Sequence, residues 1–163
     1  MLDRKLLGTY LNDHLAGSTV GLELAKRARR SNEGSEYGEV LERIAGEIEE
    51  DRATLQKLMD AFEIKRDRPK VMGAWAAEKV GRLKPNGRLL SYSPLSRVVE
   101  LEFLCLGVTG KLSLWKALLE VADTDDRLDA EELTALASRA QKQWMGLEEQ
   151  RLRAAAEAFT APD

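Results

Sequence analysis

Four long segments of this chain place apolar residues three and four positions apart, which is the spacing of one face of an α-helix. Each segment holds about 25 to 30 residues and would be roughly 40 Å long as a helix. Four helices of similar length predict a bundle, so we expect an all-α fold in a single domain that covers residues 1–163. The expected helices are residues 3–30, 36–62, 93–122 and 129–159.

The composition agrees with helices and limits the possible functions. The chain is rich in Ala, Leu, Glu, Lys and Arg and has only 4 prolines. Its net charge of −3 does not favour nucleic-acid binding by the chain as a whole. The single cysteine, Cys105, excludes an internal disulfide and a cysteine metal cluster. Its neighbours in sequence are apolar, so we expect a buried, unreactive thiol.

Targeting signals are not evident in the sequence. The N-terminal residues MLDRKLLG lack the apolar core of a signal peptide. Fully apolar runs extend over only a few residues, so no membrane span is expected. The simplest expectation is a cytoplasmic location.

Three helix starts carry recognisable capping residues. Ser35 precedes the second helix, and Ser93 followed by Pro94 opens the third. Asp129 and Glu132 have the spacing of a capping box at the fourth helix. These residues predict where the helices begin.

The connections between the helices predict the topology. Short loops join the first helix to the second and the third to the fourth, so each pair should be antiparallel. A connection of about thirty residues, 63–92, is long enough to run the full length of the bundle. Within it, residues 70–80 could form a short outer helix, and residues 84–87, KPNG, predict a turn. Two hairpins joined by one long crossover form the ferritin-like arrangement.

An acidic residue interrupts each of the first three apolar stripes near its middle: Asp13, Asp51 and Glu102. The crossover topology would bring all three to a similar depth in the bundle. Burial of an unpaired carboxylate costs several kcal/mol, so such groups need partners. A divalent metal ion or buried arginines could neutralise them.

This layout resembles the ferritin-like superfamily of di-iron carboxylate proteins. In that family the first and third helices each give a Glu, and the second and fourth each give a Glu-x-x-His motif. The resemblance assigns Asp13, with His14 beside it, to the first position, Asp51 in EEDRATLQKLM to the second, and Glu102 to the third. It implies a site for iron or manganese built from Asp13, His14, Asp51 and Glu102.

The chain departs from the family pattern at several positions. Thr54 stands where the second helix should provide histidine, and the fourth helix contains no histidine. Its nearest polar candidate on the inner face is Gln143, and glutamine is a poor iron ligand. We therefore expect a degenerate metal site in a non-enzymatic protein with a structural, interaction or stress-related role. The alternative is an iron- or manganese-binding oxidase or storage protein that uses a residual carboxylate site.

The three acids also have an interpretation that needs no metal. They could pair with His14, Arg139 or Arg151, or lie at the solvated edge of the bundle. In that case the cluster is structural.

Basic residues are concentrated in one part of the chain. Residues 65–97 carry a net charge of +7, whereas the rest of the chain carries −10. This asymmetry could mark a surface for an anionic partner. Alternatively, the segment docks on the acidic faces of the helices.

Glycines inside the helices suggest close contact between helices. Gly17 and Gly21 are four positions apart in the first helix, and each costs up to about 1 kcal/mol relative to alanine. Close helix approach, within the bundle or between subunits, would offset this cost. We therefore expect a homo-oligomer, with a dimer packed through the first helix as the specific prediction.

Overall fold

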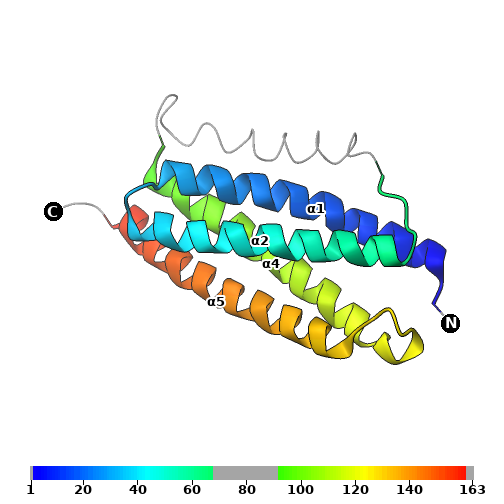
Figure 1. Cartoon of the computed structure of the whole chain (residues 1–163). Coiled ribbons are helices and arrows are strands. Elements are labelled where there is room, and N and C mark those ends of the chain that lie inside the picture. The colour runs from blue at the N-terminus through cyan, green and yellow to red at the C-terminus, as the bar shows by residue number, and fades with distance from the viewer. Residues whose placement is uncertain (1, 68–91, 161–163) are drawn as a thin grey trace.

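The computed structural model describes residues 2–67 and 92–160, and its regular structure there is entirely helical. This confirms the expected all-α class. The elements are α1 (Arg4–Ser31), α2 (Glu36–Ala61), α4 (Pro94–Leu119), the short 3₁₀ helix η1 (Ala122–Thr124) and α5 (Ala130–Phe159) (Figure 1). None of these helices is long and apolar enough to cross a membrane.

The four long helices pack as two antiparallel hairpins. α1 contacts α2 and α4, and α5 contacts α4 and α2. α2 and α4 run in the same direction, so α2 ends and α4 begins at opposite ends of the bundle (Figure 1). Most of the predicted crossover 63–92 lies outside the described residues, as do the predicted helix at 70–80 and the predicted turn at 84–87.

Asn32, in the loop between α1 and α2, joins the two hairpins. Its buried side chain donates from Nδ2 to the Ala28 carbonyl and to the Tyr92 hydroxyl, both at 2.8 Å. Its Oδ1 accepts from Arg97 Nε at 2.6 Å. The start of α4 is therefore held against the α1–α2 loop.

The predicted N-caps Ser35, Ser93 and Asp129 are confirmed. Ser35 Oγ accepts from the Gly38 amide at 3.3 Å, and Ser93 Oγ accepts from the Ser96 amide at 3.1 Å. Asp129 accepts from the second and third amides of α5. These side chains satisfy backbone donors that have no partner within the helix, so they define where the helices start.

The apolar spacing predicts an inner face of α1 made of Leu6, Tyr10, Asp13, Gly17, Val20, Leu24 and Ala28. Leu24 and Ala28 are buried as predicted, but the face is wrong over the first half of the helix. Leu6, expected inside, is 68% exposed, and Asp13 is also exposed. The core residues are instead Leu11, Leu15 and Leu22. Both series have helical spacing, and a shift of one residue turns the face by roughly 100°. α1 packs against both α2 and α4, and this packing buries the series that contains Leu11, Leu15 and Leu22.

The predicted inner acid of α4 is also wrong. Glu102 is exposed, whereas Glu100 is only 4% exposed. Glu100 accepts from Arg27 Nε at 3.0 Å and Nη2 at 2.7 Å, and from the Tyr92 hydroxyl at 3.0 Å. Apolar residues surround most of α4, so periodicity does not mark one face and the acid was assigned to the wrong position.

Cys105 is buried on α4, as expected. Burial raises the pKa of its thiol to about 11. The thiol lies 3.9 Å from Glu148 Oε2 and remains protonated near neutral pH. This agrees with an unreactive cysteine.

A pair of truncations tests the orientation of α1. Leu11→Ala should lower the free energy of unfolding by about 2–5 kcal/mol, because it leaves a cavity in the core. Leu6→Ala should change it by less than about 0.5 kcal/mol, because Leu6 is exposed. Urea unfolding followed by circular dichroism measures both, and equal effects would contradict this orientation.

Candidate functional site

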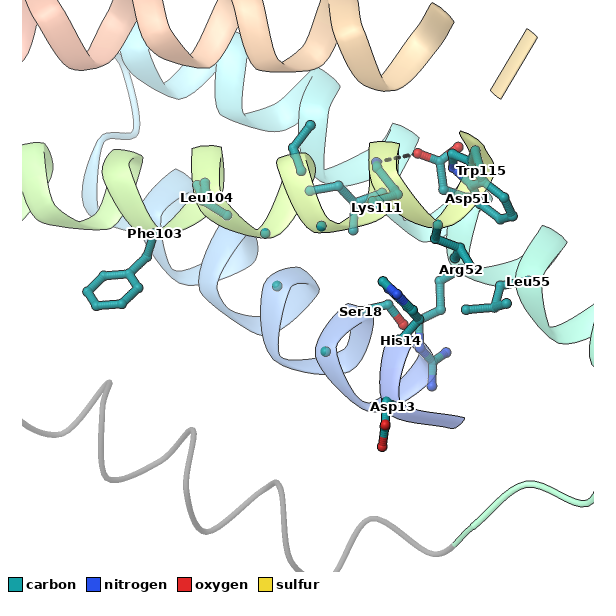
Figure 2. Close-up of a pocket in the computed structure, with 17 residues that line it drawn as sticks. Asp13, His14, Ser18, Asp51, Arg52, Leu55, Phe103, Leu104, Lys111 and Trp115 are labelled. Atoms are coloured by element: carbon teal, nitrogen blue, oxygen red, sulfur yellow. Dashed lines mark hydrogen bonds and ion pairs between the residues drawn. The ribbon is translucent and has the colours of Figure 1, made fainter. Parts of the chain in front are cut away.

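Asp51 is the centre of a polar cluster inside the bundle. It lies on the inner face of α2 and is 2% exposed. Its Oδ2 contacts the Lys111 ammonium, shown by the dashed line in Figure 2, and its Oδ1 accepts from Arg139. Gln143 Nε2 donates to Oδ2 at 3.3 Å, while Gln143 Oε1 accepts from Lys111. Both carboxylate oxygens therefore have partners.

Three helices supply this cluster. Asp51 comes from α2, Lys111 from α4, and Arg139 and Gln143 from α5. Gln143 is fully buried, and its amide bridges the carboxylate and the ammonium. The cluster thus connects the α1–α2 hairpin to the α4–α5 hairpin by charged groups rather than by apolar contact alone.

Lys111 is unusual in this cluster because it is a lysine whose side chain is mostly buried. Its side chain is 14% exposed. Burial lowers the pKa of Lys111, because an ammonium loses hydration there, and the Asp51 carboxylate acts in the opposite direction. The ion pair with Asp51 is thus the main interaction that favours the charged form of this lysine.

Arg139 divides its guanidinium between two acids. One end group contacts Asp51, and Nη1 donates to Glu50 at 3.0 Å. Its Nε has no hydrogen-bond partner among the described residues. The interpretation that pairs an inner acid with Arg139 is therefore confirmed for Asp51.

His14 and Asp13 lie at the α1 side of the site. The His14 ring packs edge-on against Tyr10, with ring centroids 4.6 Å apart. Burial lowers the pKa of His14, and the neighbouring Asp13 carboxylate opposes this shift. Asp13 itself points away from the cluster (Figure 2).

Glu102 lies elsewhere, on the exposed side of α4, with Oε2 4.0 Å from Arg151. Asp13, His14 and Asp51 line one cavity, but Glu102 does not. Within residues 2–67 and 92–160, no three His, Cys, Asp or Glu side chains are grouped so that they could hold a metal ion. Metal binding by the four predicted residues stays a prediction.

Sequence reasoning missed Lys111. A signal existed, since Lys111 is the only charged residue between Glu102 and Lys116 in an otherwise apolar part of α4. A single charge in such a stretch indicates a buried partner as readily as a solvated edge.

A cavity of about 230 Å³ adjoins the cluster, between α1, α2 and α4. Phe103 and Leu104 lie toward one end of it in Figure 2, while Asp51, Lys111 and Trp115 lie toward the other. The cavity therefore has an apolar end and a charged end.

Glycines of α1 and α4 keep this cavity open. Gly17, Gly21, Gly107 and Gly110 line it, and a Cβ atom at any of them would meet nothing within 4 Å in the described part of the chain. At these positions the glycines do not allow close helix contact within the bundle. A dimer packed through Gly17 and Gly21 stays a prediction.

Comparison with known proteins gives no assignment, because no family model, curated protein or solved structure matches this chain.

Removal of the central carboxylate tests the cluster. Asp51→Ala should lower the free energy of unfolding by about 3–5 kcal/mol, because it leaves Lys111 without its buried counter-ion. Asp51→Leu combined with Lys111→Met should recover most of this loss, since no unpaired buried charge remains between these two positions. Urea unfolding measures both variants.

Asp13→Ala is the matched control for this series. Because Asp13 is exposed, it should change stability by less than about 0.5 kcal/mol. A loss as large as that of Asp51→Ala would contradict the assignment of Asp51 as the inner acid.

Proposed function

We propose that this chain is a ferritin-like four-helix bundle in which an internal ion-pair cluster stands where the family holds metal, and that it acts by binding rather than by catalysis. Two antiparallel hairpins, with α2 and α4 running in the same direction, support the ferritin-like arrangement. A structural, interaction or stress-related role would each fit this proposal, because none of them requires catalysis.

The contact of Lys111 with Asp51 carries the proposal. The resemblance makes Asp51 the metal ligand of the second helix, yet the charge beside this carboxylate comes from a lysine. A divalent ion at Asp51 would have to displace the Lys111 ammonium and would lie next to the Arg139 guanidinium. Both groups repel a metal cation.

The donor set around Asp51 does not fit iron or manganese. Lysine and arginine cations are hydrogen-bond donors without lone pairs for a metal, and the Gln143 amide is a weak ligand. That leaves Asp51 as the one carboxylate of this cluster. The alternative of an iron or manganese oxidase or storage protein therefore has little chemical support here.

The adjoining cavity supports a binding role. It combines an apolar wall with several polar groups, which is the usual composition of a small-molecule site. Ser18 and His14 both line it, but the Ser18 hydroxyl donates to the Leu15 carbonyl at 2.7 Å, and no hydrogen bond joins it to His14 among the described residues.

Metal content tests this proposal directly. Untagged protein would be loaded anaerobically with Fe(II), Mn(II) or Zn(II), desalted, and measured by mass spectrometry beside Asp51→Ala. We expect no stoichiometric metal in either protein. One equivalent that is lost in Asp51→Ala would establish a mononuclear site, and two equivalents would restore the di-metal enzyme.

A second candidate is an anionic partner for basic residues 65–97. The structure describes 65–67 and 92–97 of this segment, and there Arg66 pairs with Asp60 at 2.5 Å and Arg97 with Glu157 at 3.2 Å. These contacts favour docking of basic residues on the acidic faces of the helices.

Charge removal distinguishes the two uses of the basic segment. A variant with Lys79, Arg82, Lys84 and Arg88 changed to Gln would be compared with wild type on immobilised heparin over a salt gradient. If the segment binds polyanions, the variant elutes at clearly lower salt, because fewer counter-ions are released. Identical elution would exclude these four residues as an anion-binding surface.

A further inference from the structure

We propose that the cavity between α1, α2 and α4 binds a small amphipathic carboxylic acid, with its carboxylate at Arg52 and its apolar body extending toward Phe103. The inference rests on the proposed binding function and names the ligand class. Three observations support it: the size of the cavity, its uneven polarity, and an arginine without a carboxylate partner.

The size of the cavity limits the ligand. Its volume is about 230 Å³. An apolar protein cavity of about 150 Å³ holds benzene, which has six carbon atoms. By this comparison the cavity accepts a molecule of roughly nine or ten non-hydrogen atoms. That is the size of a medium-chain fatty acid.

The polarity of the cavity calls for a ligand with two unlike ends. Phe103, Leu104 and Val108 provide apolar surface on α4, and Gly107 beside them leaves room against the helix backbone. The charged residues lie toward the opposite end (Figure 2). A hydrocarbon chain gains free energy on leaving water for the first region, whereas a polar head group suits the second.

Arg52 supplies the charge for that head group. It extends from α2, where its Nε donates to the Thr19 hydroxyl of α1 at 3.3 Å. No carboxylate lies within 4 Å of it among the described residues, although Asp51 and Asp13 line the same cavity. Asp51 is paired with Lys111 and Arg139, and Asp13 points away. Arg52 is half-buried as a residue, and its guanidinium is available to an external anion because no carboxylate of the described residues pairs with it.

The sign of the charge selects an acid over other amphiphiles. A primary amine would be repelled by Arg52. An alcohol would fill the apolar end but leave Arg52 without a counter-ion. A carboxylate offers two oxygen acceptors to the guanidinium. Hydrogen bonds between such charged groups are stronger than those between neutral groups.

Titration of the full chain with octanoate tests the proposal by isothermal calorimetry. We expect saturable binding at one site. Arg52→Gln should weaken binding roughly tenfold or more, because it removes a charge-assisted contact. Lys57→Gln is the matched control, since it removes a positive charge from an exposed position of the same helix, and it should leave the affinity unchanged.

Gly107→Leu tests the apolar end, since a leucine side chain would occupy the cavity and should abolish binding. Circular dichroism would verify that this variant is folded, and Arg52→Gln provides an independent answer if it is not. Equal affinity for octanoate, octanol and octylamine would overturn the acid class. So would unchanged octanoate binding by Arg52→Gln, or no saturable binding by wild type.

Metal content measured on the same preparation separates the two proposals. Metal-free protein that does not bind octanoate would overturn the ligand class alone. Stoichiometric metal lost in Asp51→Ala would overturn the proposed function, whatever the octanoate titration gives.

Discussion

The buried carboxylate of Asp51 is the constraint on which the rest of the bundle depends. A charge that is 2% exposed must be neutralised within the protein, so α4 and α5 have to present Lys111, Arg139 and Gln143 at that depth. Apolar contacts alone would permit helices to slide or rotate, because they lack direction. Glu100 and Arg27 have the same effect between α4 and α1. The ion pairs of Asp51 with Lys111 and Arg139, and that of Arg27 with Glu100, thus fix the relative positions of helices from both hairpins.

The fold could be predicted where one side of a helix is clearly apolar. On α2 the apolar series that includes Asp51 and Leu55 is buried, and Ser35 caps the helix as the sequence predicts. On α1 two leucine-containing series compete, and only contact with two neighbours selects the one that includes Leu11. α4 is apolar around most of its circumference, so its spacing could not distinguish Glu100 from Glu102.

The candidate site was harder to predict because its chemistry depends on partners distant in sequence. An acid inside a bundle indicates a cation but does not say which kind. The sequence permits either a metal ion or an arginine as the partner of Asp51. It does not indicate that the partner is Lys111, which is 60 positions from Asp51. The cavity is still less visible in the sequence, since glycines are expected at close helix contacts, whereas Gly107 and Gly110 border open space.

The side chain of Asn32 has a consequence for how the chain folds. Each hairpin closes through a short loop and can form from local contacts, whereas Asn32 contacts Tyr92 and Arg97, which are 60 and 65 positions away in the sequence. Contacts between α2 and α5 are sparse beside those within either hairpin. The two hairpins are thus natural cooperative folding units, and the seam between α2 and α5 is where native-state opening would expose amides to exchange before global unfolding.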